Sequence, residues 1–146
     1  MAKDCLLIID DEQDMRSGLK RMLGRNFEEL EILTAADAES GLLQIEEVAI
    51  DLVLLDIKMP GMSGLELLKQ LSTTAPWLTV IMMTGFGSIE TAVEAIKLGA
   101  YDFISKPFNK DDICRVIRKG IERKRLIQEN YFLKQGAIIP VLIKKY

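Results

Sequence analysis

A chain of 146 residues has the size of one ordinary domain, and a composition of 49% hydrophobic and 28% charged residues is typical of a globular fold. The net charge of −3 does not favour direct binding to nucleic acid, which needs a basic face. The absence of histidine excludes Ser-His-Asp and Cys-His catalysis and histidine zinc sites. Nothing resembles a signal peptide or a membrane span, so we expect a cytoplasmic protein with no membrane partner. The two cysteines, Cys5 and Cys114, have no metal spacing and are expected to be buried thiols.

Five short apolar runs, each about the length of a strand, alternate with segments of helical periodicity. The runs are Cys5–Ile9, Leu30–Thr34, Leu52–Leu55, Leu78–Met83 and Tyr101–Ile104. Several are apolar throughout, which is typical of strands covered on both faces. Between them, apolar residues recur with helical spacing, as at Ile89, Val93 and Ile96. Five such β-then-α units predict an α/β fold, a doubly wound parallel sheet with helices on both sides.

Helix boundaries are marked by capping residues. Ser63 and Glu66 have the spacing of a capping box, and Asn109 can cap a last helix that has acids in its first turn. Gly99 is suited to end the fourth helix. These signals predict where three of the helices begin or end.

The last predicted helix is unusually long, from about Lys110 to Gln135, with Gly120 as its only glycine. Leu126, Asn130 and Leu133 have the spacing of a coiled-coil seam with one polar core position. Two interpretations stay open, a dimer contact or a solvated helix that leads to another domain. The segment from Gly136 to Tyr146 is apolar around Pro140, and the sequence assigns no role to it.

The residues that could carry chemistry follow the predicted strands. Asp10 and Asp11 follow the first run and Asp56 follows the third, while Thr84 and Lys106 follow the fourth and fifth. In an open parallel sheet, ligands bind beyond the carboxyl ends of the strands. Each residue alone has an ordinary explanation as a helix cap or a turn residue. Together they predict three carboxylates, a hydroxyl and an ammonium at one edge of the sheet.

Three carboxylates within a few ångströms repel one another and need a cation. Oxygen ligands select a hard ion, and Mg²⁺ suits a small site that keeps several waters. A lysine and a hydroxyl beside such an ion suit a transferred phosphoryl group, whose oxygens need positive charge and donors. We therefore expect Asp56 to be a nucleophile that forms an acyl phosphate, with Lys106 and Thr84 binding the phosphoryl oxygens.

Four short motifs carry a resemblance to a known family. They are Ile8-Ile9-Asp10-Asp11-Glu12, Leu55-Asp56-Ile57-Lys58-Met59-Pro60-Gly61, Met83-Thr84-Gly85 and Ser105-Lys106-Pro107-Phe108. In order and spacing the chain resembles the receiver domain of bacterial two-component response regulators, from about Asp4 to Arg123. The stretch from Gly87 to Ala95, with Gly99 to Phe103, resembles most the receivers of nitrogen-regulatory type. Those precede an ATPase that activates sigma-54 polymerase.

The resemblance implies a flavodoxin-like sheet in the order 2-1-3-4-5 and a phosphoryl group taken from the histidine of a sensor kinase with Mg²⁺ present. It implies that Asp56 is the phosphoacceptor and that Lys106 is the lysine that binds the phosphoryl group. The implied metal ligands are Asp10, Asp11, Asp56 and the backbone carbonyl of Lys58. The resemblance also implies that Thr84 and Phe103 form the switch pair and that the Lys106–Pro107 peptide bond is cis. Two departures are Gly85, where alanine is common, and Phe103, which lacks the hydroxyl of a tyrosine.

On this interpretation residues 1–123 are the receiver and residues 124–146 are a helical extension with an unassigned tail. A homodimer would use the C-terminal helix or the face formed by the fourth helix, fifth strand and fifth helix. The downstream ATPase and DNA-binding region is not present in this chain. We expect a regulatory domain, not an enzyme, that phosphorylates itself from small phosphodonors and dephosphorylates itself.

Two alternatives have other functions. A hydrolase working through an aspartyl phosphate usually has a second Asp two residues after the nucleophile, where this chain has Lys58. An interaction module that keeps only the fold would not need Asp10, Asp11, Asp56, Thr84 and Lys106, and all five are present.

Overall fold

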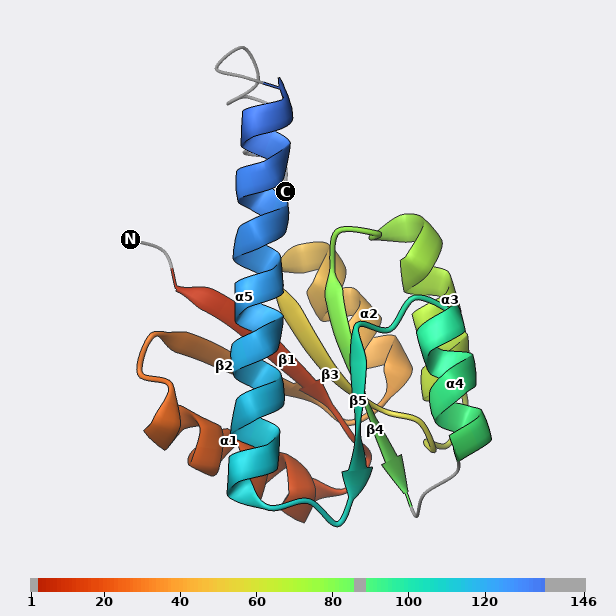
Figure 1. The fold of residues 1–146 in the computed structure, drawn as a ribbon. Coiled ribbons are helices and arrows are strands. Elements are labelled where there is room, and N and C mark those ends of the chain that lie inside the picture. The colour runs from red at the N-terminus through yellow and green to blue at the C-terminus, as the bar shows by residue number, and fades with distance from the viewer. Residues whose placement is uncertain (1–2, 86–88, 136–146) are drawn as a thin grey trace.

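The structure, a computed structural model, describes residues 3–85 and 89–135, with side chains described as far as residue 129. Strands and helices alternate along the chain (Figure 1). The strands are β1 (Asp4–Ile9), β2 (Leu30–Ala35), β3 (Leu52–Asp56), β4 (Thr79–Gly85) and β5 (Asp102–Lys106). The helices are α1 (Gln13–Asn26), α2 (Ala38–Glu47), α3 (Gly64–Thr74), α4 (Ile89–Lys97) and α5 (Lys110–Gln135). Each strand lies within two residues of its predicted bounds.

The strands form one parallel sheet in the order β2-β1-β3-β4-β5, which confirms the predicted topology. Every residue of β3 is buried, and so are five of the six residues of β1. This agrees with apolar runs that do not alternate with polar residues, because both faces of these strands are covered. β2 and β5 lie at the two edges of the sheet, and each has two or more polar residues that are at least partly exposed.

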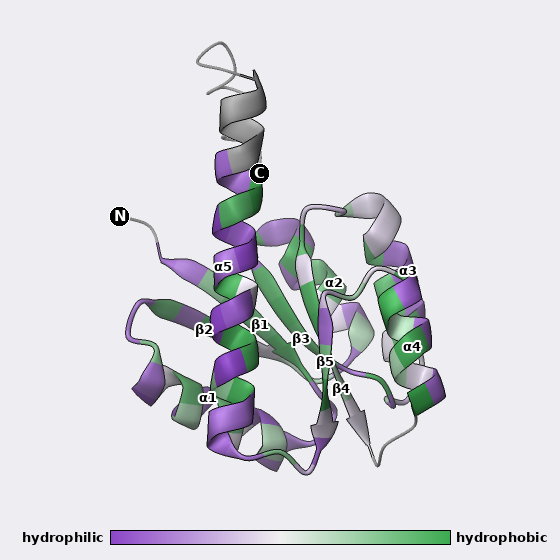
Figure 2. Cartoon of the chain, in the orientation of Figure 1, coloured by the Kyte–Doolittle hydropathy of each residue, from purple (hydrophilic) through white to green (hydrophobic). Residues whose placement is uncertain are grey.

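Helices cover both faces of the sheet, and the sheet separates the core into two clusters. Alternate residues of one strand point to opposite faces, so Leu7 and Ile9 pack with α2, α3 and α4, whereas Leu6 and Ile8 pack with α1 and α5. Figure 2 shows the apolar sheet between helices that carry both polar and apolar residues. Among the described residues, no helix is both long enough and apolar enough to cross a bilayer.

The predicted helix boundaries are confirmed. The Ser63 hydroxyl accepts from the backbone N–H of Glu66 at 3.2 Å, and the Asn109 side chain accepts from the N–H of Asp112 at 2.8 Å. Gly99 follows α4 with a φ of +114°, a conformation that favours glycine. The first backbone N–H groups of a helix have no carbonyl acceptor within the helix, and each cap supplies an acceptor for one of them.

α5 covers the sheet with its first half and projects beyond it with its second (Figure 1). Gly120 lets it approach closely, since a Cβ there would lie 2.7 Å from the Leu52 side chain. Of the predicted coiled-coil seam, Leu126 is 54% exposed. The side chains of Asn130 and Leu133 lie outside the described residues, as does the segment 136–146, so the seam stays a prediction.

Two basic residues anchor α5 at the amino-terminal edge of the sheet. The Lys124 ammonium lies 2.6 Å from an Asp4 carboxylate oxygen and 3.5 Å from one of Asp51. The Arg123 guanidinium donates to the Thr79 hydroxyl at 2.8 Å and lies over the Tyr101 ring, 5.2 Å from its centroid. These contacts fix the direction in which the helix leaves the sheet.

Gly64 allows α3 to begin directly against the end of β3, because a Cβ at this residue would lie 2.1 Å from the Asp56 backbone oxygen. We expect Gly64→Ala to lower the free energy of unfolding by about 1–3 kcal/mol, the usual effect of overpacking. Gly18→Ala is the matched control, since a Cβ in that part of α1 meets nothing within 4 Å. It should raise the stability by about 0.5–1 kcal/mol through helix propensity. Urea unfolding followed by circular dichroism measures both, and equal effects would contradict the packing argument.

Burial, together with the nearby charges of Glu31 and Asp51, raises the pKa of the Cys5 thiol to about 11. At pH 8 only about one thiol in a thousand would be the reactive thiolate. We expect iodoacetamide to leave Cys5 unmodified in the native protein and to modify it rapidly in urea, as measured by peptide mass spectrometry. Native-state labelling at the rate of a free cysteine would show that this strand is not covered as described.

Candidate functional site

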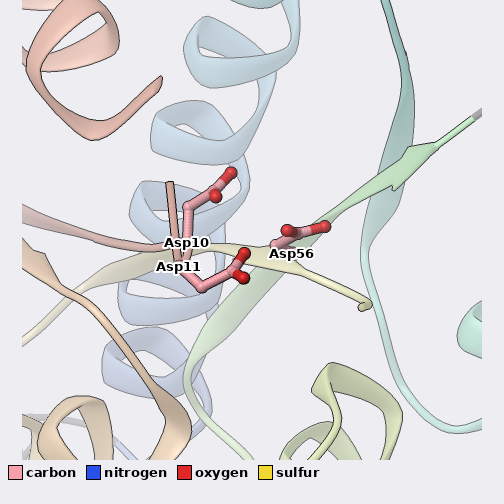
Figure 3. Close-up of side chains that lie close together, drawn as sticks. All are labelled: Asp10, Asp11 and Asp56. Atoms are coloured by element: carbon pink, nitrogen blue, oxygen red, sulfur yellow. The ribbon is translucent and has the colours of Figure 1, made fainter. Parts of the chain in front are cut away.

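Three aspartates converge at the carboxyl-terminal edge of the sheet. Asp10 follows β1 directly, Asp11 comes next, and Asp56 is the last residue of β3. β1 and β3 are hydrogen-bonded neighbours, with Ile9 opposite Leu55, so their ends coincide. One carboxylate oxygen from each aspartate lies within 4.8 Å of the others, and Figure 3 shows the three side chains together. The predicted convergence is confirmed.

The most buried member, Asp10, is held by its own loop. Its side chain has no exposed surface, and one carboxylate oxygen accepts from the Glu12 backbone N–H at 2.9 Å. The Arg16 guanidinium donates to the backbone carbonyl of Asp10 at 2.7 Å. Sequence reasoning missed Arg16, although a basic residue at the first turn of the helix after an acidic pair is a signal that could have been used. The turn that presents the two aspartates is thus fixed from both sides.

The Lys106 ammonium reaches this cluster from β5. It lies 3.0 Å from a carboxylate oxygen of Asp10 and 3.4 Å from one of Asp56. Lys106 is the last residue of β5 and precedes a cis peptide bond to Pro107, as predicted. Three carboxylates beside one ammonium leave a formal charge of −2.

The protonation equilibria reflect this crowding. Burial raises the pKa of Asp56, the Asp10 charge adds to the effect, and the nearby Lys106 opposes it only in part. Burial by itself would lower the pKa of Lys106, but its bond to Asp10 and the charges of Asp56 and Asp10 outweigh that and raise it. Lys106 therefore stays an ammonium, and ionisation of Asp56 is less favourable than ionisation of an ordinary carboxyl.

The other predicted site residues lie around this cluster. Thr84 and Lys106 are within β4 and β5, not after them as the sequence suggested. The Thr84 hydroxyl is buried and donates toward the Ile104 carbonyl at 3.5 Å and the Ser105 hydroxyl at 3.4 Å. Phe103 is on β5 with 39% of its surface exposed, and Lys58 is exposed in the loop after β3. The roles of Thr84, Phe103 and the Lys58 carbonyl stay predictions.

The donor set fits a hard divalent cation. All three side chains offer carboxylate oxygens, which is the chemistry that Mg²⁺ prefers. An octahedral ion with ligands at 2.0–2.1 Å spans at most about 4.2 Å between opposite ligands, so small side-chain rotations would close the observed set. One divalent ion would also cancel the formal charge of the site.

A doubly wound sheet with an acidic cluster, a threonine and a lysine at its carboxyl edge defines a receiver domain of two-component signalling. The response regulator receiver domain family matches residues 6–118. The chain belongs to this family.

Relatives among characterised proteins support the same assignment. Nitrogen assimilation regulatory protein NtrX of Azorhizobium caulinodans is 44% identical over 137 residues, 92% of this chain and 30% of that protein. The C4-dicarboxylate transport transcriptional regulatory protein DctD of Rhizobium meliloti is 36% identical over 93% of this chain and 29% of its own length. The likeness to sigma-54-dependent activators of nitrogen-regulatory type is confirmed. The chain spans about a third of the length of these relatives.

Solved structures agree with the observed fold. NtrX from Brucella abortus, crystallised in complex with ADP, superimposes with a TM-score of 0.83 at 41% identity over 90% of this chain and 30% of that chain. The separate receiver domain of the same protein gives a TM-score of 0.75 at 44% identity, covering 80% of this chain and 98% of that chain.

The raised pKa of Asp56 predicts that its charge costs stability. The stabilising contribution of this carboxyl is fully present below its ordinary pKa of 3.8 and is lost as the pH rises through its higher pKa in the folded protein. In EDTA at pH 7 we expect Asp56→Asn to raise the free energy of unfolding by about 1 kcal/mol, the size of a solvent-screened charge contact. The gain should shrink as the pH is lowered.

Asp51→Asn is the control for this measurement, since Asp51 precedes the same strand but lies beside Lys124 at the opposite edge of the sheet. It removes a charge that has a cationic partner in Lys124 and accepts from the Cys5 backbone N–H, so it should not stabilise the protein. Urea unfolding at several pH values distinguishes the two variants. A destabilised Asp56→Asn protein would mean that attraction to Lys106 outweighs the repulsion.

Proposed function

We propose that this domain is a phosphoacceptor in which Asp56 takes a phosphoryl group from a sensor histidine kinase. The observation that carries the proposal is the Lys106 ammonium lying between Asp10 and Asp56 at the edge of a receiver sheet. An ammonium in that position can bind a phosphoryl oxygen once Asp56 is modified. The chain has no histidine, so the donor histidine lies outside the 146 residues of this chain.

In the transfer step, a carboxylate oxygen of Asp56 attacks phosphorus. An O–P bond forms as the P–N bond to the donor histidine breaks, and the electron pair returns to the imidazole ring. The product is an acyl phosphate. Asp10, Asp11, Asp56 and the Lys58 carbonyl would hold Mg²⁺, which when bound supplies positive charge to the phosphoryl oxygens. Lys106 would give up its contact with Asp56 and donate to one of these oxygens.

Movements of Thr84 and Phe103 would couple the modification of Asp56 to a change in the conformation of the surface. Both contacts of the Thr84 hydroxyl are longer than usual for O–H donors, so little is lost when the hydroxyl turns to a phosphoryl oxygen. The exposed Phe103 ring could then move into the space that Thr84 leaves. A new charge with acceptor oxygens is enough to reorder a loop in other phospho-switches.

The changed surface is a candidate dimer contact. Ile89, Val93, Ile96 and Phe103 are exposed large apolar residues on α4 and β5, around a hollow of about 410 Å³. We propose this face, or the projecting part of α5, as a homodimer contact. Such apolar patches often mark interaction sites.

We further propose that residues 1–123 act as the receiver and residues 124–146 as an extension leading to a sigma-54-type ATPase and DNA-binding region, because longer relatives are transcriptional regulators. The domain is regulatory. Its own chemistry would be limited to accepting a phosphoryl group, also from small phosphodonors, and to losing it by hydrolysis. We propose a cytoplasmic location, where a sensor kinase and a transcriptional output would act.

Incubation with acetyl phosphate and Mg²⁺ tests the proposal. Intact-mass spectrometry should show one added phosphoryl group in the parent chain and none in Asp56→Asn or in the presence of EDTA. Asp51→Asn is the matched control, an aspartate next to the other end of β3, and it should be modified like the parent. Modification of Asp56→Asn, or none in the parent chain, would overturn the assignment of Asp56.

A further inference from the structure

A second hollow lies at the amino-terminal edge of the sheet, away from the acidic cluster. It has a volume of about 710 Å³ and is lined by the end of α2, the segments that lead into β3 and β4, and α5. The large apolar side chains of its lining are those of Ile45, Val48, Ile50, Trp77, Leu78 and Ile127. Figure 1 shows α5 projecting beyond the sheet, and Lys124, Ile127 and Gln128 of this helix form one wall of the groove.

Large apolar side chains meet solvent in this groove. Val48 is 38%, Trp77 42% and Ile127 37% exposed, and they come from three separate parts of the chain. Contiguous apolar surface of this kind is uncommon on a domain that nothing else contacts. Within the described ranges, no segment covers it.

The charges around the groove are acidic. Lys124, the one basic residue in the lining, already pairs with Asp4 and Asp51. Glu46 and Glu47 are exposed and have no ion-pair partner in the part of the chain that the structure describes. The groove therefore suits an apolar segment that carries positive charge at one end.

The same chain contains such a segment close by. Residues 138–143 are aliphatic except for Pro140, and Lys144 and Lys145 follow them. Ile127 precedes the last residue of α5, Gln135, by eight positions, roughly 12 Å of helix. Eleven residues after Gln135 can extend roughly 36 Å, which is enough to return to the groove. Gly136 stands where a helix-terminating glycine allows the chain to reverse.

We propose that residues 138–145 dock in cis into this groove. The aliphatic side chains would cover Val48, Trp77 and Ile127, and Lys144 and Lys145 would lie beside Glu46 and Glu47. Such a contact braces the projecting end of α5 against the body of the domain, next to the Lys124 anchor. It does not depend on phosphoryl transfer at the opposite edge.

Trp77 is the only tryptophan of the chain and lines the groove, so its fluorescence reports on docking. In the 146-residue chain, Leu142→Asp should reduce the docked-to-undocked ratio at least about tenfold, because it removes a buried leucine and introduces a charge. The Trp77 emission should shift to longer wavelength, and acrylamide should quench it more strongly. Leu43→Asp is the control, an exposed leucine of α2 outside the groove lining, and it should change neither signal. Identical quenching of Leu142→Asp and the parent would overturn the proposal.

A disulfide test separates docking in cis from docking between copies. Cys5 and Cys114 are buried, so the pair Val48→Cys and Leu142→Cys supplies the accessible thiols. Mild oxidation should give an intramolecular disulfide, seen as a monomer on a non-reducing gel and as a linked peptide by mass spectrometry. The control pair uses Lys20→Cys on α1, which packs on the other face of the sheet, and should link much less. Disulfide-linked dimers as the main product, or equal linking in the control pair, would overturn docking in cis.

Discussion

The repulsion among Asp10, Asp11 and Asp56 is the constraint on which the functional edge of this protein depends. Parallel pairing of β1 with β3 brings their carboxyl ends together, and the sheet then forces like charges into contact. Lys106 compensates one charge from β5, two strands away from β3 in the sheet. The fold thus holds a site whose negative charge is balanced only when a cation completes it. A site of this kind responds to a ligand because its resting state is electrostatically incomplete.

The support around the cluster keeps the charges from moving apart. Asp10 is fixed through its neighbours in the loop, by the Glu12 N–H on its side chain and by Arg16 on its carbonyl. Gly64 lets α3 begin against the backbone of Asp56, so the residue cannot recede without unpacking the helix. The Thr84 hydroxyl, in contrast, makes long contacts of 3.5 Å and 3.4 Å with described residues of β5. The rigid and the loosely held members of the site therefore lie on different strands.

The two edges of the sheet pair their aspartates in similar ways but differ in the charge that remains. At one edge Lys124 lies between Asp4 and Asp51, and these contacts anchor α5. At the other edge Lys106 lies between Asp10 and Asp56, and Asp11 adds a third carboxylate that no described cation pairs. The excess of negative charge is therefore larger at the edge that carries the acidic cluster.

The sequence by itself determined the α/β class, the parallel sheet, the helix caps and the set of residues at the strand ends, because those follow from periodicity, run length and local hydrogen bonding. The order 2-1-3-4-5 and the cis Lys106–Pro107 bond came from a family resemblance. Only the tertiary structure decided that Lys106 contacts Asp10 and Asp56, that Arg16 holds the turn that presents Asp10 and Asp11, and that a groove with Trp77 opens beside α5. These features depend on the three-dimensional crossing of distant segments, and no spacing within one element encodes such a crossing.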